Sequence, residues 1–433
     1  MTASEEPEQQ APAGTKNHTG GAGGRAPLVT PPFALAWLVN FTQYLAFYIL
    51  VTTMALYAVK QFAASDAGGG LASSAFVVGA TLARVFAGYL VDTFGQRRIL
   101  LVSLVVVAIA CGLYLPAGSL VLLIAVRMLH GIGYAFASTA TMALAQSVIP
   151  PKRRAEGTGY YALGSTLATA IGPAIGLMIV GDFSYDVLFW TSLGIAVLGL
   201  LLGLLLHRYT HQPIPGAIET RTKQAFSLRN IAHPAVVPIG SFMLIVGLCY
   251  AGVITYLNAY SEQRGVVFGA SMFFLAYAAS MFVMRFVLGR LQDHRGDNVV
   301  VYLGLVSFAV ALVVLALADQ DWQVILAGAL TGLGYGTLMP AAQAIAVRLV
   351  PPHQLGTGIS TLLLLTDAGV GLGPILLGFF VAHWGYGSMY ALLAVLIVLS
   401  ALFYHAAHGR KDIARPGAAV IALDGRSLGS PKK

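Results

Sequence analysis

Charged residues are scarce in this chain and make up only 10% of its 433 positions, against about 25% in an average soluble domain. Hydrophobic residues make up 57%. A water-exposed globule could not be covered by so little polar surface, so we predict that most of the chain lies in lipid. Cysteine is almost absent as well. Cys111 and Cys249 both fall inside apolar runs, as small core residues do, so we expect neither a disulfide nor a metal site.

Motifs of energy-transducing and catalytic proteins are also missing. The chain has no Walker-type Gly-x-x-x-x-Gly-Lys-Ser/Thr, which argues against an ATP-driven motor. Gly332-x-Gly334-x-Gly336 lies within an apolar run, so it is not a dinucleotide loop. Neither a metalloprotease motif nor a nucleophile elbow occurs. We therefore expect no enzyme activity and no cofactor.

Apolar runs long enough to cross about 30 Å of hydrocarbon, at about 1.5 Å per residue, recur along the chain. The predicted spans are 33–59, 71–92, 99–116, 119–148, 158–181, 185–206, 234–260, 269–292, 298–318, 321–350, 356–382 and 384–408. Polar stretches divide the rest. We predict a disordered tail at 1–30, six-helix units at 31–206 and 234–408, a linker at 207–233, and a second tail at 409–433.

Basic residues show how the chain is oriented. Most lysines and arginines outside the spans lie in the loops after even-numbered spans, whereas the loops after odd-numbered spans hold only Lys60 and Arg264. Basic loops are retained in the cytoplasm, so we expect a multi-pass protein of the cell membrane with both termini cytoplasmic. The net charge of +8 does not indicate a nucleic-acid partner, because such proteins gather their basic residues on one soluble face.

The chain contains an internal duplication with a constant displacement of 201 residues. The repeated positions are Arg84, Gly88, Asp92 and Gly95 with Arg285, Gly289, Asp293 and Gly296; Gly131, Gly133 and Tyr134 with Gly332, Gly334 and Tyr335; Pro150-Pro151 with Pro351-Pro352; and Gly172-Pro173 with Gly373-Pro374. One register held over separate segments indicates a duplicated six-helix unit. Both copies start on the same side of the membrane. The predicted fold is therefore an all-α integral membrane protein with twelve transmembrane helices in two parallel-repeat six-helix bundles.

Local motifs agree with this organisation. They are Gly88-x-x-x-Asp92-x-x-Gly95-x-Arg97-Arg98, Arg127-x-x-x-Gly131-x-Gly133, and Gly164 followed by Gly172-Pro173-x-x-Gly176. The first resembles the loop signature of the major facilitator superfamily, the second its buried-arginine motif, and the third the motif associated with its antiporters. Tyr160-Tyr161 resembles the bacterial drug and metabolite efflux branch. The resemblance covers about 33–408 and implies secondary transport by alternating access.

The loop signature predicts a conformational latch. Gly88 allows close approach of a neighbouring helix. Asp92 can accept hydrogen bonds from a helix N-terminus or pair with Arg97 or Arg98, after the turn at Gly95. Such contacts would hold one state of two rocking bundles; the alternative is a plain turn that carries a topology signal. Asp293 and Gly296 look like a degraded copy, because Gly296 is followed by Asp297 and Asn298 and not by a pair of arginines.

Glycine and proline in the fifth and eleventh spans predict hinges. Proline removes a backbone donor and bends a helix, and glycine permits tight packing. We expect these residues to lie on the moving seam between the bundles, although static close packing would also explain them. The hinge candidates are Gly164, Gly172, Pro173, Gly176, Gly373 and Pro374.

Ionisable residues at membrane depth are costly and usually functional. Asp367 lies near the midplane in the eleventh span, and its repeat partner is Thr166. Burial disfavours the charged form of a carboxylate and lets it exchange protons near neutral pH. We predict that Asp367 binds a proton or a substrate cation; the alternative is a structural partner for an arginine.

The other buried charges are arginines. Arg127 is a candidate counter-charge or substrate-anion site, or else an arginine bonded to helix carbonyls. Its neighbour His130 could titrate near neutral pH or simply pack. Arg84 and Arg285 are repeat equivalents, which favours a structural role for both.

The first span carries no acidic residue, unlike many proton-coupled members of the family, and this leaves proton coupling to Asp367. It also suits a neutral, aromatic-walled substrate cavity. From their positions alone we name Asn40, Gln43, Tyr44 and Tyr250 as candidate lining residues.

The predicted function is proton-coupled export of a small organic molecule, a drug or a metabolite, by an antiporter of the multidrug-resistance type. A symporter that imports a nutrient is the alternative, and a transporter-like receptor without flux is a third class. The expected partners are a small-molecule substrate, protons and the lipid bilayer, and we expect a monomer.

Overall fold

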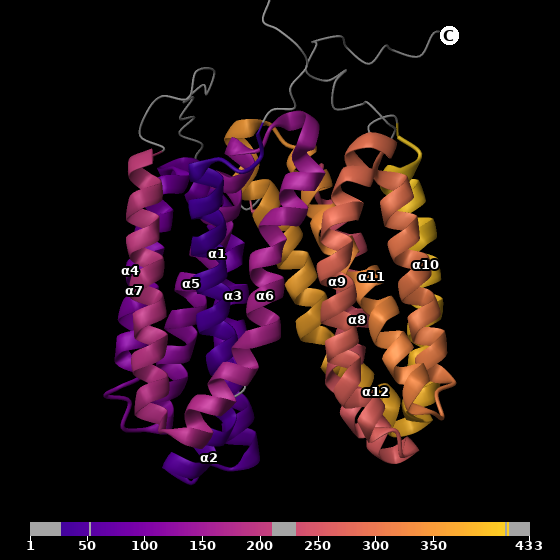
Figure 1. The fold of residues 1–433 in the computed structure, drawn as a ribbon, viewed down its shortest axis with the longest axis horizontal. Helices are drawn as coiled ribbons and strands as arrows, with labels where there is room; N and C mark the ends of the chain where they lie inside the picture. Colours follow the sequence, from indigo (N-terminus) through magenta and orange to yellow (C-terminus); the bar gives the residue numbers. More distant parts are fainter. Residues whose placement is uncertain (1–26, 52, 210–230, 412–413, 415–433) are drawn as a thin grey trace, which may run out of the picture.

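The computed structural model describes residues 27–51, 53–209, 231–411 and 414. Its first half contains α1 (Pro31–Val51), α2 (Met54–Phe62), α3 (Asp66–Phe94), α4 (Gln96–Leu113), α5 (Leu120–Val148), α6 (Arg154–Asp182) and α7 (Tyr185–Tyr209). Its second half contains α8 (Val237–Arg264), α9 (Val267–Arg295), α10 (Asp297–Ala316), α11 (Asp321–Arg348) and α12 (Leu355–Tyr404). Short turns of helix precede α6 and α12 at Pro151–Arg153 and Pro352–Gln354. The two halves lie side by side (Figure 1).

Eleven helices in the described residues are long and apolar enough to cross a membrane. The last of them is two helices joined at Gly385, whose backbone is not helical (φ 75°, ψ 170°). The twelve predicted spans are thus accounted for, and the predicted all-α fold is confirmed. The first span, predicted at 33–59, is divided between α1 and α2. The predicted tails at 1–30 and 409–433 and the predicted linker fall largely outside the described residues.

Repeat-equivalent glycines make the same helix contact in each bundle. A Cβ on Gly131 of α5 would lie 2.0 Å from the Phe76 carbonyl oxygen on α3, and a Cβ on Gly332 of α11 would lie 2.3 Å from the Tyr277 carbonyl oxygen on α9. Only glycine permits backbones to approach so closely. The duplication seen in the sequence is therefore also a duplication of packing.

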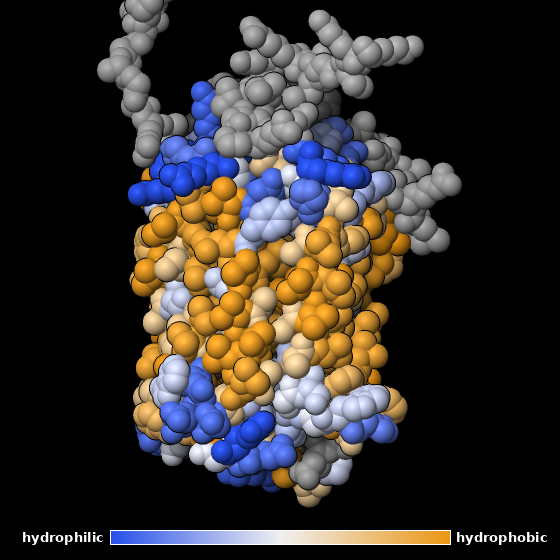
Figure 2. All heavy atoms as spheres, turned by 90° about the vertical axis from the view of Figure 1, so that its right-hand side faces the viewer, coloured by the Kyte–Doolittle hydropathy of each residue, from blue (hydrophilic) through white to orange (hydrophobic). Residues whose placement is uncertain are grey.

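On the face drawn in Figure 2, a wide band of hydrophobic side chains crosses the middle of the molecule, with hydrophilic side chains gathered at both ends. Large apolar residues such as Val102, Leu275 and Val306 are exposed, as lipid contact requires. We call the end that carries Arg97, Lys152 and Arg290 the basic end.

Candidate functional site

The two bundles are joined at the basic end by a carboxylate seated on a helix N-terminus. Asp92, near the end of α3, accepts hydrogen bonds from the backbone N–H groups of Gly356 and Thr357 and from the Thr357 hydroxyl, each at 2.7 Å. The first N–H groups of a helix lack internal partners and carry partial positive charge. We call this contact between α3 and α12 the first latch.

Glycine allows the first latch to close. A Cβ on Gly88 would lie 2.6 Å from the Thr357 Cα, so a side chain there would push α12 away. Gly95 has φ +91°, which ends α3 directly after the latch. Of the two contacts that the sequence allowed for Asp92, the structure contains the helix N-terminus; in the described residues Asp92 forms no ion pair with Arg97 or Arg98.

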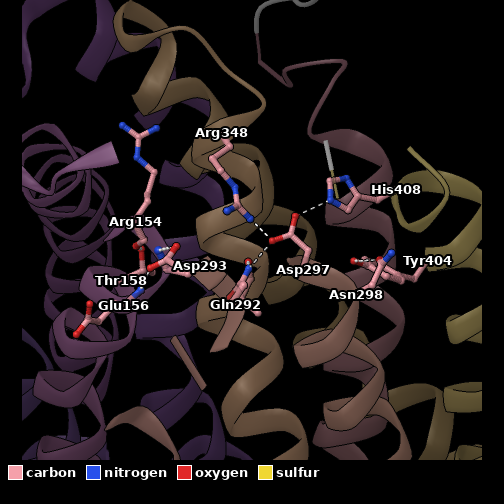
Figure 3. Close-up of polar contacts among 12 residues, drawn as sticks. Arg154, Glu156, Thr158, Gln292, Asp293, Asp297, Asn298, Arg348, Tyr404 and His408 are labelled. Atoms are coloured by element: carbon pink, nitrogen blue, oxygen red, sulfur yellow. Dashed lines mark hydrogen bonds and ion pairs between the residues drawn. The ribbon is translucent and has the colours of Figure 1, made fainter. Parts of the chain in front are cut away.

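The duplication supplies a second latch between α9 and α6. Asp293 accepts hydrogen bonds from the backbone N–H groups of Ala155 and Glu156 at 2.9 and 2.8 Å (Figure 3). A Cβ on Gly289 would lie 2.7 Å from the Glu156 Cα. The expectation of a degraded copy was therefore wrong. The carboxylate, the glycine and the helix N-terminus make the contact, and the arginine pair is not part of it.

Two further polar clusters flank the second latch. Glu156 pairs with Arg153 and with Arg290 of the other bundle, both at 2.7 Å. Asp297, the repeat equivalent of Gln96, is buried between Arg348 and His408 (Figure 3). The first cluster joins the bundles, and the second holds the end of α12 to α10 and α11 within one bundle.

A buried ion pair crosses between the bundles deeper in the membrane. The Arg84 Nε of α3 lies 2.5 Å from the Asp367 Oδ2 of α12, and the two side chains are 5% and 30% exposed. The Ser360 hydroxyl donates to the Arg84 carbonyl oxygen at 2.5 Å. Arg84 also lies over the Tyr134 ring, 5.9 Å from its centre. Asp367 is about 18 Å along α12 from Leu355, at about 1.5 Å per residue, and the break at Gly385 is about 45 Å along, so the pair lies nearer to the basic end than to the break.

Aromatic side chains from both bundles surround this pair. Tyr44 meets Tyr134 edge-on, with ring centres 5.6 Å apart. In the other bundle Tyr250 stacks on Tyr335 at 3.7 Å. Tyr335 is close enough to Tyr44, Tyr48 and Asp367 to interact electrostatically with them. Tyr44 and Tyr250 both belong to these aromatic groups, and their role as lining residues of a substrate cavity stays a prediction.

The chain matches a protein-family model along most of its length. The model of the Major Facilitator Superfamily matches residues 36–318 and, in a second overlapping match, residues 267–419. The chain belongs to the Major Facilitator Superfamily. It is therefore a multi-pass secondary transporter and not an enzyme.

Relatives of this superfamily member include uncharacterized MFS-type transporters. One from Methanocaldococcus jannaschii is 20% identical over 378 residues, which cover 84% of this chain and 94% of the relative. One from Burkholderia pseudomallei is 27% identical over 360 residues, which cover 79% and 84%.

Solved structures with the same fold include the human organic anion transporter MFSD10 and the proton:xylose symporter XylE. MFSD10 has a TM-score of 0.73 at 17% identity and covers 86% of this chain and 98% of its own. XylE has a TM-score of 0.74 at 14% identity and covers 91% and 98%. These likenesses show the fold alone.

Arg127 of the transporter is bonded to helix carbonyls. It is completely buried on α5, and its guanidinium donates to the carbonyl oxygens of Ala72 and Ser73 on α3 at 3.2 and 3.0 Å. His130, one turn away, lies 3.1 Å from the Tyr114 hydroxyl and is buried. An arginine bonded to helix carbonyls and a packed histidine are the alternatives that we set beside direct function. A direct role for either residue stays a prediction.

The predicted cavity residues Asn40 and Gln43 face their own bundle. A Cβ on Gly164 of α6 would lie 3.2 Å from the Asn40 Nδ2, and a Cβ on Gly199 of α7 would lie 3.4 Å from the Gln43 Nε2. Both residues are buried. The structure places Asn40 against α6 and Gln43 against α7, and their role as lining residues of a substrate cavity stays a prediction.

The hinge glycines pack closely against the first helix of their own bundle, which is the static packing that we set beside the predicted seam, and a role on the seam stays a prediction. A Cβ on Gly172 would lie 2.5 Å from the Tyr48 Cβ, and a Cβ on Gly176 would lie 2.4 Å from the Ile49 carbonyl oxygen. Gly373 packs in the same way against Ala251. The fifth helix of each repeat is the neighbour of the first within one bundle. Pro173 and Pro374 lie within α6 and α12, and hinge bending there stays a prediction.

Among the described residues, no group of three or more histidine, cysteine, aspartate or glutamate side chains could hold a metal ion. Cys111 and Cys249 are free and buried.

Proposed function

We propose that this transporter is a proton-coupled exporter of small organic molecules and that Asp367 is its coupling group. The observation that carries the proposal is the ion pair between Arg84 and Asp367, which joins the two bundles at membrane depth. A carboxylate that holds the bundles together only while it is charged links the state of a proton to the conformation of the protein.

We place the basic end in the cytoplasm, because short basic loops are retained there. Both latches close the bundles at that end. The structure then corresponds to the conformation that is closed towards the cytoplasm and faces outward. The interbundle hydrogen bonds and ion pairs found in the described residues support this assignment, since they lie nearer to the basic end than to the opposite end.

In the proposed cycle a proton from outside binds the Asp367 Oδ2 and removes its charge. Arg84 then loses its partner, and separation of the bundles at the basic end becomes favourable. The proton leaves Asp367 towards the cytoplasm, and substrate binds from the same side. Return to the cytoplasm-closed state restores the ion pair and releases substrate outside. One proton thus enters for each substrate that leaves.

The direction of transport is the part of this proposal that most needs a test. The resemblance of Gly164, Gly172, Pro173 and Gly176 to the antiporter motif supports export. A symporter remains the competing candidate, since the fold shared with XylE serves a proton:xylose symporter. Proton movement opposite to substrate movement supports export, and movement in the same direction supports import.

The test uses proteoliposomes with an imposed pH gradient and a pH-sensitive dye inside. Lipophilic cations, neutral antibiotics, sugars, carboxylates and chelator-like metabolites are added one at a time. We expect Asp367→Asn to lower substrate-dependent proton movement at least about tenfold and Asp367→Glu to keep part of it. Asp182→Asn, at an exposed residue of the opposite end, is the matched control. Gradient-driven transport that survives Asp367→Asn would show that another group carries the proton.

A further inference from the structure

The two repeat-equivalent arginines, Arg84 and Arg285, differ in whether an acidic residue lies opposite them. Arg84 faces Asp367, whereas Arg285 has Thr166 at the position that the repeat assigns to the acid. Thr166 is buried, and its hydroxyl donates to the Ala162 carbonyl oxygen at 3.0 Å. The duplication therefore supplies two buried guanidinium groups but only one counter-charge.

Arg285 has no acceptor for its side-chain N–H groups among the described residues. Its Nε and Nη1 are buried and unpaired, and the whole residue is 8% exposed. No carboxylate of the described chain lies within ion-pair distance of it. A buried charge without a partner is strongly unfavourable, because neither water nor an anion compensates it. Such a group at membrane depth indicates a function that the resting structure leaves incomplete.

A cavity lies beside this arginine. Its enclosed part, about 20 Å³, has room for about one water molecule, and its lining includes Met281, Met284, Arg285, Gly159 and Pro340. An organic ligand can therefore enter only after the helices around the cavity move apart. Methionine side chains adapt to apolar ligands of different shape.

The acidic side chains near the cavity already have ion-pair or hydrogen-bond partners. Glu156 is held by Arg153 and Arg290. Asp293 accepts from the first N–H groups of α6. Neither side chain is free to neutralise Arg285, so its counter-ion has to come from outside the described chain.

We propose that Arg285 binds the anionic group of the transported substrate and that the substrates are small organic carboxylates with an apolar body. This inference rests on the proposed transport function and adds the substrate class to it. The planar guanidinium matches a carboxylate with two parallel hydrogen bonds. The bound carboxylate compensates the charge of Arg285, as Asp367 compensates the charge of Arg84. The cavity borders the contact between α6 and α9, so separation of the second latch opens it towards the basic end.

Three probes of nearly the same shape isolate the charge: benzoate, benzamide and benzamidine, which are an anion, a neutral amide and a cation. Thermal unfolding of the purified full-length protein is followed with each probe at equal ionic strength in chloride. We expect benzoate to raise Tm by roughly 2–4 °C at saturation, and the other two to leave it unchanged.

Three variants at one position test the guanidinium. Arg285→Gln and Arg285→Met remove the charge and are expected to abolish the benzoate shift, whereas Arg285→Lys keeps a smaller shift. Arg285→Met also removes an uncompensated charge, so its Tm without probe should equal or exceed that of the wild type. That result would show that the variant folds. A benzoate shift that persists in Arg285→Met, or that is absent in the wild type, overturns the proposal.

The same experiment separates this inference from proton coupling. Asp367→Asn should keep the benzoate shift while it loses substrate-dependent proton movement. If Asp367→Asn loses coupling and Arg285→Gln has no effect on labelled benzoate exchange, the substrate class is rejected and the coupling scheme is kept. The opposite pattern would reject the coupling scheme alone. Stabilisation by vesicles of phosphatidylglycerol, but not of phosphatidylcholine or by benzoate, would identify a lipid headgroup as the anion and reject the substrate class.

Discussion

Removing the charge of either latch aspartate should open the basic end of the transporter. In Asp92→Asn one carboxylate oxygen becomes an amide NH₂ group, and a donor then faces the backbone N–H of either Gly356 or Thr357. The equivalent change, Asp293→Asn, does the same at the N-terminus of α6. The two variants affect different helices and leave the buried pair of Arg84 and Asp367 in place.

The size of the effect follows from the contacts. Asp92 accepts three hydrogen bonds of 2.7 Å at a helix N-terminus, and hydrogen bonds to charged groups contribute about 1.5–3 kcal/mol each. Water replaces part of this when the latch opens. We therefore expect a net loss of about 2–3 kcal/mol for each variant, or a change of roughly 30- to 150-fold in the ratio of closed to open molecules. The double variant should lose about 4–6 kcal/mol if the two latches act independently.

Distances between spin labels at the basic end measure this change. Lys152 and Arg295 are exposed and belong to opposite bundles, and cysteines introduced there report the separation by pulsed electron resonance. The native cysteines, Cys111 and Cys249, are 0% exposed, so they should take up little label. The wild type should show mostly the short distance, each single variant a mixture, and the double variant mostly the long distance.

A control variant and the double variant test whether the carboxylates hold the closed state. Asp182→Asn, at the opposite end, should leave the distance distribution unchanged. If the double variant keeps the wild-type distribution, the carboxylates do not hold the closed state and our interpretation of both contacts is wrong. If Asp92→Asn acts but Asp293→Asn does not, the second contact is packing without a share in the conformational equilibrium.

Two further changes test packing and buried charge through the Tm of the purified protein. Gly131→Ala should lower stability by about 2 kcal/mol or more, because its Cβ would lie 2.0 Å from the Phe76 carbonyl oxygen. The control Gly371→Ala, whose Cβ would have nothing within 4 Å, should stay within about 0.5 kcal/mol of the wild type. Equal losses of stability in the two variants would contradict the proposed helix contact. Asp297→Asn should cost about 3–5 kcal/mol, because it leaves Arg348 buried without its counter-charge, and a Tm close to that of the wild type would show that the pair contributes little.

The sequence was sufficient for the fold because the repeat is carried by residues that the packing needs. Gly131 and Gly332 hold the same register in the chain and the same close contact in the structure. Span boundaries were less accurate. The break in the first span, between α1 and α2, lies within an apolar stretch whose hydropathy gives no sign of it.

The contacts of the site were harder to predict because they join distant parts of the chain. Asp367 and its partner Arg84 are 283 residues apart, and the repeat could not point to the pair because Thr166 stands in the equivalent place. The second latch was underestimated for a different reason. The arginine pair dominates the motif in the sequence, but the structure uses the carboxylate and the N-terminus of a neighbouring helix, which no local pattern around Asp293 identifies.

The contact between α3 and α12 also has a consequence for the efficiency of the proposed proton coupling. Arg84, Gly88 and Asp92 are spaced four residues apart on α3, and their partners Asp367, Ser360 and Gly356 follow one another along α12. If Asp367 is the coupling group as proposed, one helix carries contacts to both the proton site and the surface closure, so the two should change together. A proton that crosses alone would have to break the whole row of contacts without the binding energy of a substrate. This arrangement should keep uncoupled slippage low.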